Sequence, residues 1–142
     1  SQSYEAMQGM TSVYSMGPFF EKWFADDPAL MQKKVQNNLK FFNCQTYFGA
    51  AITAAALAIE QDRDPSSLQL ATSLKTSLMG PFSGIGDALF NTIPKVVMGA
   101  MTAYAAIEGN WITSIIMIAI FTPLITWVRQ KMIEVGYYGG AE

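Results

Sequence analysis

The sequence predicts an all-α membrane protein built from amphipathic N-terminal helices, transmembrane helices and a re-entrant hairpin broken by glycine and proline. Three observations support this fold class. Of the 142 residues, 51% are hydrophobic and only 14% are charged, whereas about a quarter of a typical soluble protein is charged. Two uncharged stretches, Phe41–Ile59 and Gly109–Val128, contain 19 and 20 residues, close to the ~20 that cross a hydrocarbon core as a helix. Between them lies the glycine-rich segment LMGPFSGIGDALFN.

Charge and residue content exclude several classes of function. The net charge is −2 and the nine basic residues are scattered, so the chain lacks the clustered Lys and Arg of a nucleic-acid surface. The single cysteine, Cys44, cannot form an internal disulfide. Histidine is absent, which excludes the usual Cys/His metal sites and the commonest general base. We therefore expect no nucleic-acid partner, no metal and no cofactor, and we expect any chemistry to be indirect.

Residues 1–40 are expected to form amphipathic helices at a membrane surface. Aromatic and methionine side chains recur at helical spacing up to Gly17 and Pro18, where the pattern predicts an interruption. Asp27 followed by Pro28 predicts the start of another helix, because an aspartate N-cap and a proline at the first helical position both favour one.

The helix after Pro28 is predicted to have one apolar face, and three lysines lie outside this face. The apolar residues are Met31, Val35, Leu39 and Phe42. The lysines are Lys33, Lys34 and Lys40. Two interpretations stay open: a cytoplasmic-side helix lying against anionic headgroups, or a surface helix of an ordinary helical domain.

Residues 41–60 are predicted to form a helix packed inside a bundle. Alanine and glycine dominate the stretch from Gly49 to Ala58, and small residues let another helix approach closely. Near the N-terminal end of this helix lie three neutral hydrogen-bonding residues, Asn43, Gln45 and Thr46. Neutral hydrogen-bonding groups at such a position either cap the helix or bind a ligand, and both roles remain open.

The region 66–94 is predicted to form the re-entrant hairpin. Leu70, Leu74 and Leu78 mark the apolar face of an amphipathic helix, and Lys75 is among the polar residues opposite. The glycines and proline of Gly80–Gly86 then predict a turn, with a second helix after it.

A single carboxylate, Asp87, follows this predicted turn and is the main candidate for a binding site. A Gly/Pro break at membrane depth frees backbone donors and acceptors, and transporters use such helix ends to hold polar substrates. A carboxylate can also accept two hydroxyl donors at once, the geometry that vicinal sugar hydroxyls present. The alternative is that Asp87 only caps the following helix. The segment GPFSGIGD lacks both the P-loop lysine and the GxGxxG spacing, so nucleotide binding is not expected.

Residues 95–135 are predicted to form apolar helices joined by a turn at Glu108–Asn110. Lys95 is expected either to snorkel toward an interface or to pair with an interior carboxylate.

Gly109–Val128 is the best candidate for a conventional membrane span. Trp111 and Trp127 lie near its two ends, as in an aromatic belt. Arg129 follows the span, and the positive-inside rule places that end in the cytoplasm. We expect the helix to end within Val135–Gly140, which contains Gly136, two tyrosines and two more glycines.

The residues resemble a known family. The opening SYEAMQGMTSVYSMGPFFEKWF, the later FFN and GPFSGIGD, and the closing WVRQKMIEVGYYGGAE are similar to the IID subunit of the mannose/fructose/sorbose family of the bacterial phosphoenolpyruvate-dependent sugar phosphotransferase system. The resemblance covers nearly the whole chain. Because members of this family normally continue into further helices, we expect the chain to be a fragment of a longer protein.

The resemblance implies a non-catalytic, multi-pass subunit in the bacterial inner membrane. Such a subunit pairs with a IIC subunit to bind a sugar and carry it inward, while separate IIA and IIB proteins relay phosphate from phosphoenolpyruvate to the sugar. We expect a hexose or amino-hexose as substrate and an oligomeric assembly in the lipid bilayer. The candidate substrate contacts are Asp87, Gly84, Gly86, Ser83, Asn43 and Gln45.

One departure from the family and one alternative role remain. The family commonly reads FFNTHPY where this chain reads FFNCQTY, with Gln45 in the place of His and Thr46 in the place of Pro. This change leaves the identity of the sugar open. The alternative role is a structural subunit that packs against IIC without contacting substrate.

Overall fold

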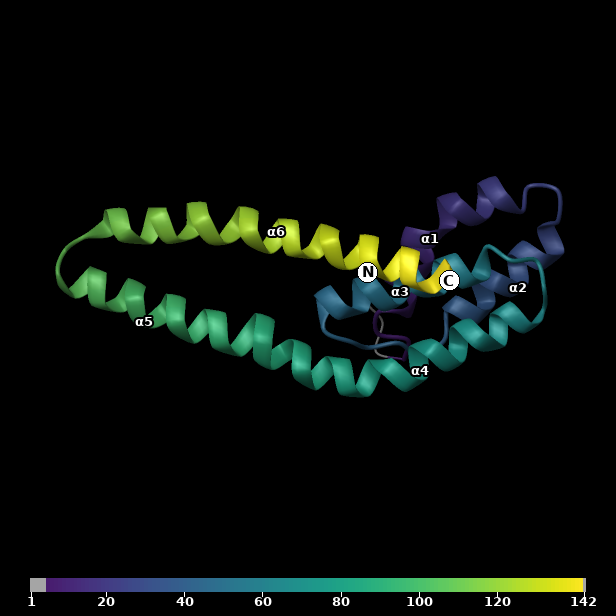
Figure 1. The fold of residues 1–142 in the computed structure, drawn as a ribbon, viewed down its shortest axis with the longest axis horizontal. Helices are drawn as coiled ribbons and strands as arrows, with labels where there is room; N and C mark the ends of the chain where they lie inside the picture. The colour runs from purple at the N-terminus through teal and green to yellow at the C-terminus, as the bar shows by residue number, and fades with distance from the viewer. Residues whose placement is uncertain (1–4, 142) are drawn as a thin grey trace.

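The computed structural model describes residues 5–141, and every named element in this range is a helix (Figure 1). The α-helices are α1 (Gly9–Trp23), α2 (Pro28–Asn38), α3 (Thr46–Glu60), α4 (Ser66–Gly86), α5 (Ile93–Ile107) and α6 (Trp111–Ala141). A π-helix, η1 (Asp87–Thr92), joins α4 to α5. The prediction of an all-helical chain is confirmed.

The molecule has two regions of different character. The first, called the base, comprises residues 5–86 and 129–141, in which α1 to α4 pack with the end of α6. The second, called the arm, comprises residues 87–128. Figure 1 shows α4, η1 and α5 as one long, continuous helical rod that bends between α4 and α5, with α6 running back beside α5 after the Glu108–Asn110 turn. Gly109 allows that turn because its φ of 71° is a conformation that other residues rarely adopt.

Local sequence signals position the helices of the base. The side chain of Asp27 accepts a hydrogen bond from the Leu30 backbone N–H at 3.0 Å, and Pro28 is the first residue of α2. The predicted start of this helix is therefore confirmed. The core of the base is formed by Met16, Phe20, Phe24 and Leu57.

The tightest helix contact joins α3 to α6. A Cβ added to Gly136 would lie 2.1 Å from the backbone oxygen of Ala51, and one added to Gly140 would lie 2.5 Å from that of Ala55. Small residues four apart on both helices thus bring the two backbones together. The prediction that the helix ends within Val135–Gly140 was wrong: α6 continues to Ala141, because Gly136 and Gly140 pack closely against α3.

The turn predicted over Gly80–Gly86 was also wrong, since α4 runs through it with Pro81 inside the helix. Tertiary packing explains the continuity. Leu78, Met79 and Phe82, on either side of Pro81, pack against a buried cluster, and such packing offsets the helix-breaking tendency of proline. The cluster comprises Phe42, Cys44 and Ile52. A re-entrant hairpin with its tip at these glycines is not what the chain forms.

The interruption predicted at Gly17 and Pro18 was wrong for the same reason. Both residues lie inside α1. Met16 and Phe20, which flank them, are 1% and 0% exposed in the core of the base, so burial on both sides keeps the helix continuous.

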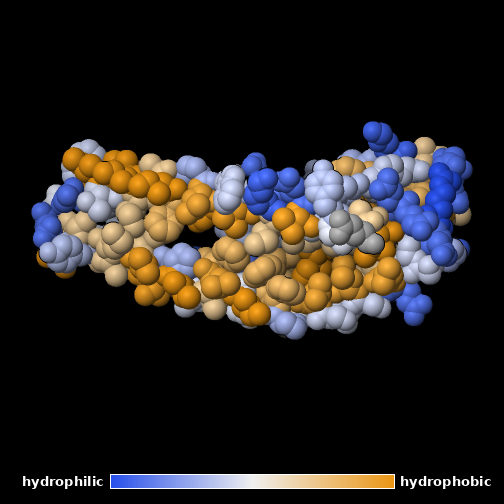
Figure 2. Space-filling model, viewed as in Figure 1, coloured by the Kyte–Doolittle hydropathy of each residue, from blue (hydrophilic) through white to orange (hydrophobic). Residues whose placement is uncertain are grey.

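The arm exposes its apolar side chains. Figure 2 shows hydrophobic residues along both helices of the arm, with hydrophilic residues gathered at its tip and at the far end of the base. Tyr104, Ile107 and Trp111 are 65%, 86% and 69% exposed. Among the described residues, α6 is the one helix that is both long and apolar enough to cross a membrane.

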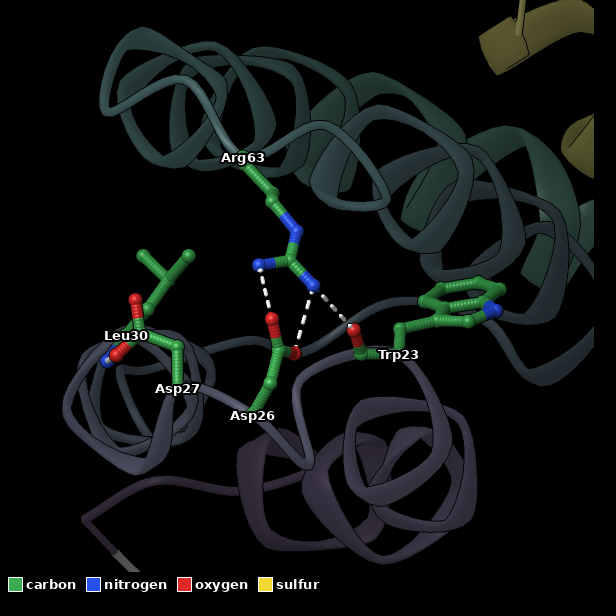
Figure 3. A network of polar contacts seen from close by, with 5 residues as sticks. All are labelled: Trp23, Asp26, Asp27, Leu30 and Arg63. Atoms are coloured by element: carbon green, nitrogen blue, oxygen red, sulfur yellow. Dashed lines mark hydrogen bonds and ion pairs between the residues drawn. The ribbon is translucent and has the colours of Figure 1, made fainter.

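Loops at the far end of the base are joined by one arginine. Figure 3 shows the guanidinium of Arg63, from the α3–α4 connection, facing the carboxylate of Asp26 in the α1–α2 connection. Two hydrogen bonds of 2.7 and 2.8 Å join these groups, and Arg63 also donates to the Trp23 carbonyl at 3.1 Å.

Candidate functional site

Asp87 lies at the first position of η1, where the rod leaves the base. Its side chain is exposed. The Asn91 side-chain amide donates a hydrogen bond of 2.8 Å to Asp87 Oδ1. Because the carboxylate accepts from a side chain and no backbone N–H within the described residues donates to it, Asp87 does not act as a helix cap here.

The π-helix η1 follows directly on the last glycine of the glycine-rich segment, Gly86. Its i→i+5 hydrogen bonds widen the helical turn, and short π-helical stretches inside α-helices are frequent at functional sites. Residues four positions apart lie on the same face of a helical segment. Asp87 and Asn91 therefore lie on one face of the rod, where their side chains are hydrogen-bonded.

Gly86 fixes the position of η1 against the base. A Cβ at this residue would lie 2.6 Å from Gln45 Cβ and 2.8 Å from Phe48 Cδ2. Any larger residue would push the rod away from the start of α3. Gly86 therefore serves close packing between α4 and α3, and it is buried.

Gln45 is buried beside Gly86, and its side chain caps α3. Its Oε1 accepts hydrogen bonds from the backbone N–H of Tyr47 at 2.8 Å and of Phe48 at 3.4 Å. Of the two roles left open by the sequence, the structure thus shows capping.

An aromatic cluster holds η1 on the base. The ring of Phe90 lies 4.6 Å from that of Tyr47 and 5.6 Å from that of Phe48, and Phe48 also lies 4.8 Å from Phe82. These separations are in the range of favourable aromatic pairs. The cluster therefore anchors the two ends of the glycine-rich segment on one helix start.

None of the other predicted site residues, all of them in the described part of the chain, donates a hydrogen bond to the Asp87 carboxylate. Ser83 is half-buried one helical turn before Asp87, and Gly84 is exposed with open space where a side chain would be. Asn43 is exposed on the α2–α3 connection. The structure brings Gly86 and Gln45 into contact, and it shows no hydrogen bond between Asn43 and any of the other candidates within residues 5–141.

The α2–α3 connection is held by Gln8. The Gln8 side-chain amide donates to the Cys44 carbonyl at 2.7 Å and accepts from the Cys44 N–H at 3.2 Å. The Gln8 backbone N–H donates to the Phe42 carbonyl at 2.8 Å. This clasp fixes the backbone on both sides of Asn43. Burial raises the pKa of the Cys44 thiol, which keeps it protonated at neutral pH.

A separate groove of about 590 Å³ lies between α1, α3 and α6. Its walls include Ser12, Met16, Leu57, Arg129 and Tyr137. None of the six residues predicted from the sequence lines it. The groove and the Asp87 face are therefore distinct places on the molecule.

The base contains a buried polar network that was not predicted from the sequence. The Lys34 ammonium donates to the carbonyls of Glu60 and Asp62 at 2.5 and 2.8 Å. Asn38 donates to Glu60 Oε2 at 2.7 Å, and Lys75 donates to Asn38 Oδ1. Lys34, Glu60 and Lys75 are all buried. Both interpretations left open for the α2 lysines place Lys34 on an exposed face, and the sequence pattern places Lys75 on a polar face; both placements were wrong, since the two side chains are buried.

Burial perturbs every charge in this network. It lowers the pKa of Lys34, lowers the pKa of Lys75 to about 8 and raises the pKa of Glu60. Glu60 Oε1 has no hydrogen-bond partner among the described residues. No signal in the sequence identifies these residues, because they come from three different helices and meet only in the fold.

Metal binding finds no support in the part of the chain that the structure describes. No group of three or more Cys, Asp or Glu side chains there is arranged to hold a metal ion.

Comparison with known proteins places the whole chain in one family. The model of the PTS system mannose/fructose/sorbose family IID component matches residues 1–142. The chain is 26% identical over 148 residues to the PTS system mannose-specific EIID component of Escherichia coli K12, covering 100% of this chain and 51% of that protein. It is 25% identical over 145 residues to the fructose permease IID component of Bacillus subtilis 168, covering 100% and 52%.

A solved structure has the same fold. It is a cryo-electron-microscopy structure of the mannose transporter ManYZ in complex with microcin E492, and one of its chains superposes with a TM-score of 0.87 at 25% identity. The match covers 99% of this chain and 53% of that one. The chain thus spans about half the length of the relatives it matches. These matches show that the chain belongs to the IID component family of the mannose/fructose/sorbose phosphotransferase systems.

Proposed function

We propose that the chain is the translocation part of a IID subunit, which binds a hexose or amino-hexose and carries it inward together with a IIC subunit. IIA and IIB proteins would supply the phosphate, so this chain would not itself perform phosphoryl transfer. The relatives named above are described as mannose-specific and fructose-permease components, which supports a hexose as the substrate class.

The observation that carries the proposal is the setting of Asp87. Its carboxylate is exposed on an arm in which apolar residues predominate, and Leu89 and Ile93 beside it are also exposed. A carboxylate in such surroundings is costly in lipid unless it faces protein or a polar cavity, and it then marks a substrate or ion pathway by default.

The arm is suited to cross the inner membrane twice. The 6 residues of η1 and the 15 of α5 form a rod of about 30 Å at ~1.5 Å per residue, and α6 returns beside it. Trp111 and Trp127 would then lie near the two interfaces. In this arrangement the chain is multi-pass, and Asp87 sits where the arm meets the base.

The proposed site is built around Asp87. Its carboxylate would accept hydrogen bonds from sugar hydroxyls. The open space beside Gly84 would admit the ligand to the backbone, and Ser83 would supply a hydroxyl. Gly86 and Gln45 would hold the rod in place, while Asn43 is a more distant contact on the clasped connection.

Uptake by an Asp87→Asn variant tests this function. The assembled transporter is expressed in cells, and uptake of radiolabelled mannose, fructose and sorbose is compared for wild type, Asp87→Asn and the control Glu108→Gln, an exposed carboxylate in the arm's turn. We expect uptake to fall at least about tenfold in Asp87→Asn, because a hydrogen bond to a charged group contributes about 1.5–3 kcal/mol. Uptake at the wild-type rate with normal assembly would reject the site.

A structural role is the second candidate, favoured by the apolar side chains that the arm exposes. In that role the arm packs against IIC, and no residue of this chain contacts sugar. It predicts that Asp87→Asn transports normally, whereas apolar-to-polar substitutions along α5 prevent assembly.

A further inference from the structure

The arm carries a stripe of polar residues on an apolar rod. Asp87, Asn91 and Lys95 follow one another at intervals of four along η1 and the first turn of α5. Residues at this spacing lie on one helical face. Leu89 and Ile93, at intermediate positions, are 50% and 55% exposed. The rod therefore has one polar face, while apolar side chains project from the others.

Asn91 supplies a hydrogen-bond donor, which the carboxylate of Asp87 lacks. An ionised carboxylate only accepts hydrogen bonds, whereas a sugar hydroxyl both donates and accepts. One N–H of the Asn91 amide is donated to Asp87 Oδ1 at 2.8 Å. A second N–H donor and the Oδ1 acceptor of Asn91 remain. Together the two side chains present acceptors and one donor, a set that matches a pair of vicinal hydroxyls better than the carboxylate alone.

The fold holds this pair in a fixed orientation. Phe90, next to Asn91 in the chain, packs on Tyr47 and Phe48 at 4.6 and 5.6 Å. Gly86, next to Asp87, lies tightly against Gln45. Both members of the pair are thus flanked by a residue anchored on the start of α3, and such preorganisation favours ligand binding.

Lys95 indicates which environment the stripe faces. It is exposed, and no hydrogen bond or ion pair joins it to any residue from 5 to 141. A carboxylate, an amide and an ammonium in line would be costly against hydrocarbon, and they are stable against water or a polar partner.

We propose that Asn91 is a second substrate-binding residue, donating to a sugar hydroxyl that Asp87 also binds, and that the face carrying Asp87, Asn91 and Lys95 opens on the aqueous pathway. This inference rests on the proposed function, and it adds a residue that sequence motifs did not single out.

Thiol labelling tests the orientation of the face. Cys44 is the one cysteine in the sequence, so Cys44→Ala gives a background for single cysteines. Asn91→Cys and Lys95→Cys are compared with the controls Leu89→Cys and Ile93→Cys in the assembled transporter in membranes, using a charged methanethiosulfonate reagent. We expect the first two to react at least about tenfold faster, and a transported sugar to slow the reaction at position 91. Equal reactivity at all four positions would overturn the orientation.

Transport kinetics test the role of Asn91. Asn91→Ala removes the amide, and Asn91→Asp keeps its shape and acceptors but removes the donor. We expect both to raise KM about 2- to 12-fold with little change in the maximal rate, as the loss of one hydrogen bond predicts. Asn110→Ala, which removes an exposed amide at the turn of the arm, serves as the control and should transport normally.

Deoxy sugars separate binding from helix stabilisation. If Asn91 contacts one hydroxyl, the variant loses affinity for the parent sugar but not for the monodeoxy analogue that lacks that hydroxyl. An equal loss for every analogue would overturn the proposal. A normal KM in both Asn91 variants, with Asp87→Asn inactive, would overturn this inference and leave the proposed function standing. Normal uptake in Asp87→Asn would reject the proposed function itself.

Discussion

Several lysines and glycines are buried or closely packed in the base, whereas those of the arm are exposed. In the base, Lys34 and Lys75 are buried and hydrogen-bonded to Asn38, Ser67 and backbone carbonyls, whereas in the arm Lys95 is exposed. Glycines differ likewise: Gly136 packs against the backbone of α3, while nothing lies within 4 Å of the Cβ position of Gly99.

The base has a hydrophobic core formed by its own helices, whereas the arm, residues 87–128, has none. Polar groups in the base find partners within the chain, as buried polar groups must. Apolar groups in the arm find few, since the two helices of the arm bury only Ala105 and Met117. The arm therefore depends on lipid or on a partner subunit for the burial that the base achieves alone.

Removing the central carboxylate of the base should have the largest effect. Glu60→Ala removes the acceptor of the Asn38 amide and the buried carboxylate whose charge favours the ammonium forms of Lys34 and Lys75, and leaving buried charges uncompensated costs about 3–5 kcal/mol. The free energy of unfolding in detergent micelles measures the loss. Glu108→Ala in the arm, which removes an exposed carboxylate, should leave that free energy unchanged. Equal effects of the two substitutions would show that the base and the arm do not differ in this way.

The contact between α3 and α6 should be the next most sensitive. Gly136→Ala places a Cβ about where the Ala51 carbonyl lies, and overpacking of this kind typically costs about 1–3 kcal/mol. Gly139→Ala is the matched control, because nothing lies within 4 Å of its Cβ position, and alanine there should stabilise the helix slightly. Thermal unfolding of the two variants distinguishes them, and a neutral Gly136→Ala would contradict the close approach of the helices.

Titration of Lys75 gives a smaller effect with a defined sign. Burial lowers its pKa in the folded state from 10.5 to about 8. Between these values the unfolded state holds a proton that the folded state has lost, so stability rises with pH across this window, by up to about 1.4 kcal/mol per pH unit. We expect the wild type to gain stability from pH 8 to pH 10 relative to Lys75→Met. A fall relative to that variant would mean that Lys75 is stabilised as a cation.

The surface ion pair at the far end of the base should have the smallest effect. Asp26 and Arg63 are well exposed, with side chains 66% and 53% accessible, and solvent screens such pairs. Asp26→Asn should leave Tm unchanged within error. A clear drop in Tm would show that Arg63 holds the two loops of Figure 3 together more strongly than exposed pairs usually do.

Local signals in the sequence predicted the start of α2 and the turn between α5 and α6. Asp27 and Pro28 specify the start of α2, and the Glu108–Asn110 turn separates α5 from α6. Because these features depend on a few neighbouring residues, they can be predicted without knowing what the helices pack against.

Features that depend on packing could not be predicted in this way. Pro81 and Gly136 read as helix breakers, yet Phe82 is held by the cluster around Phe42, and Gly136 is packed on α3. Lys75 reads as a solvent-facing lysine, but its partner Asn38 lies 37 positions away in the chain. For the site, the sequence pointed to Asp87, and only the fold showed that Asn91 is bonded to it.

We propose that this chain itself contacts the sugar at the junction of the base and the arm. Photocrosslinking tests it most directly: a photoreactive analogue of a transported hexose is activated on the purified complex, and labelled peptides are mapped by mass spectrometry. We expect a label between residues 83 and 91 that excess unlabelled sugar prevents and that Asp87→Asn loses. Labelling confined to the partner subunits would contradict it.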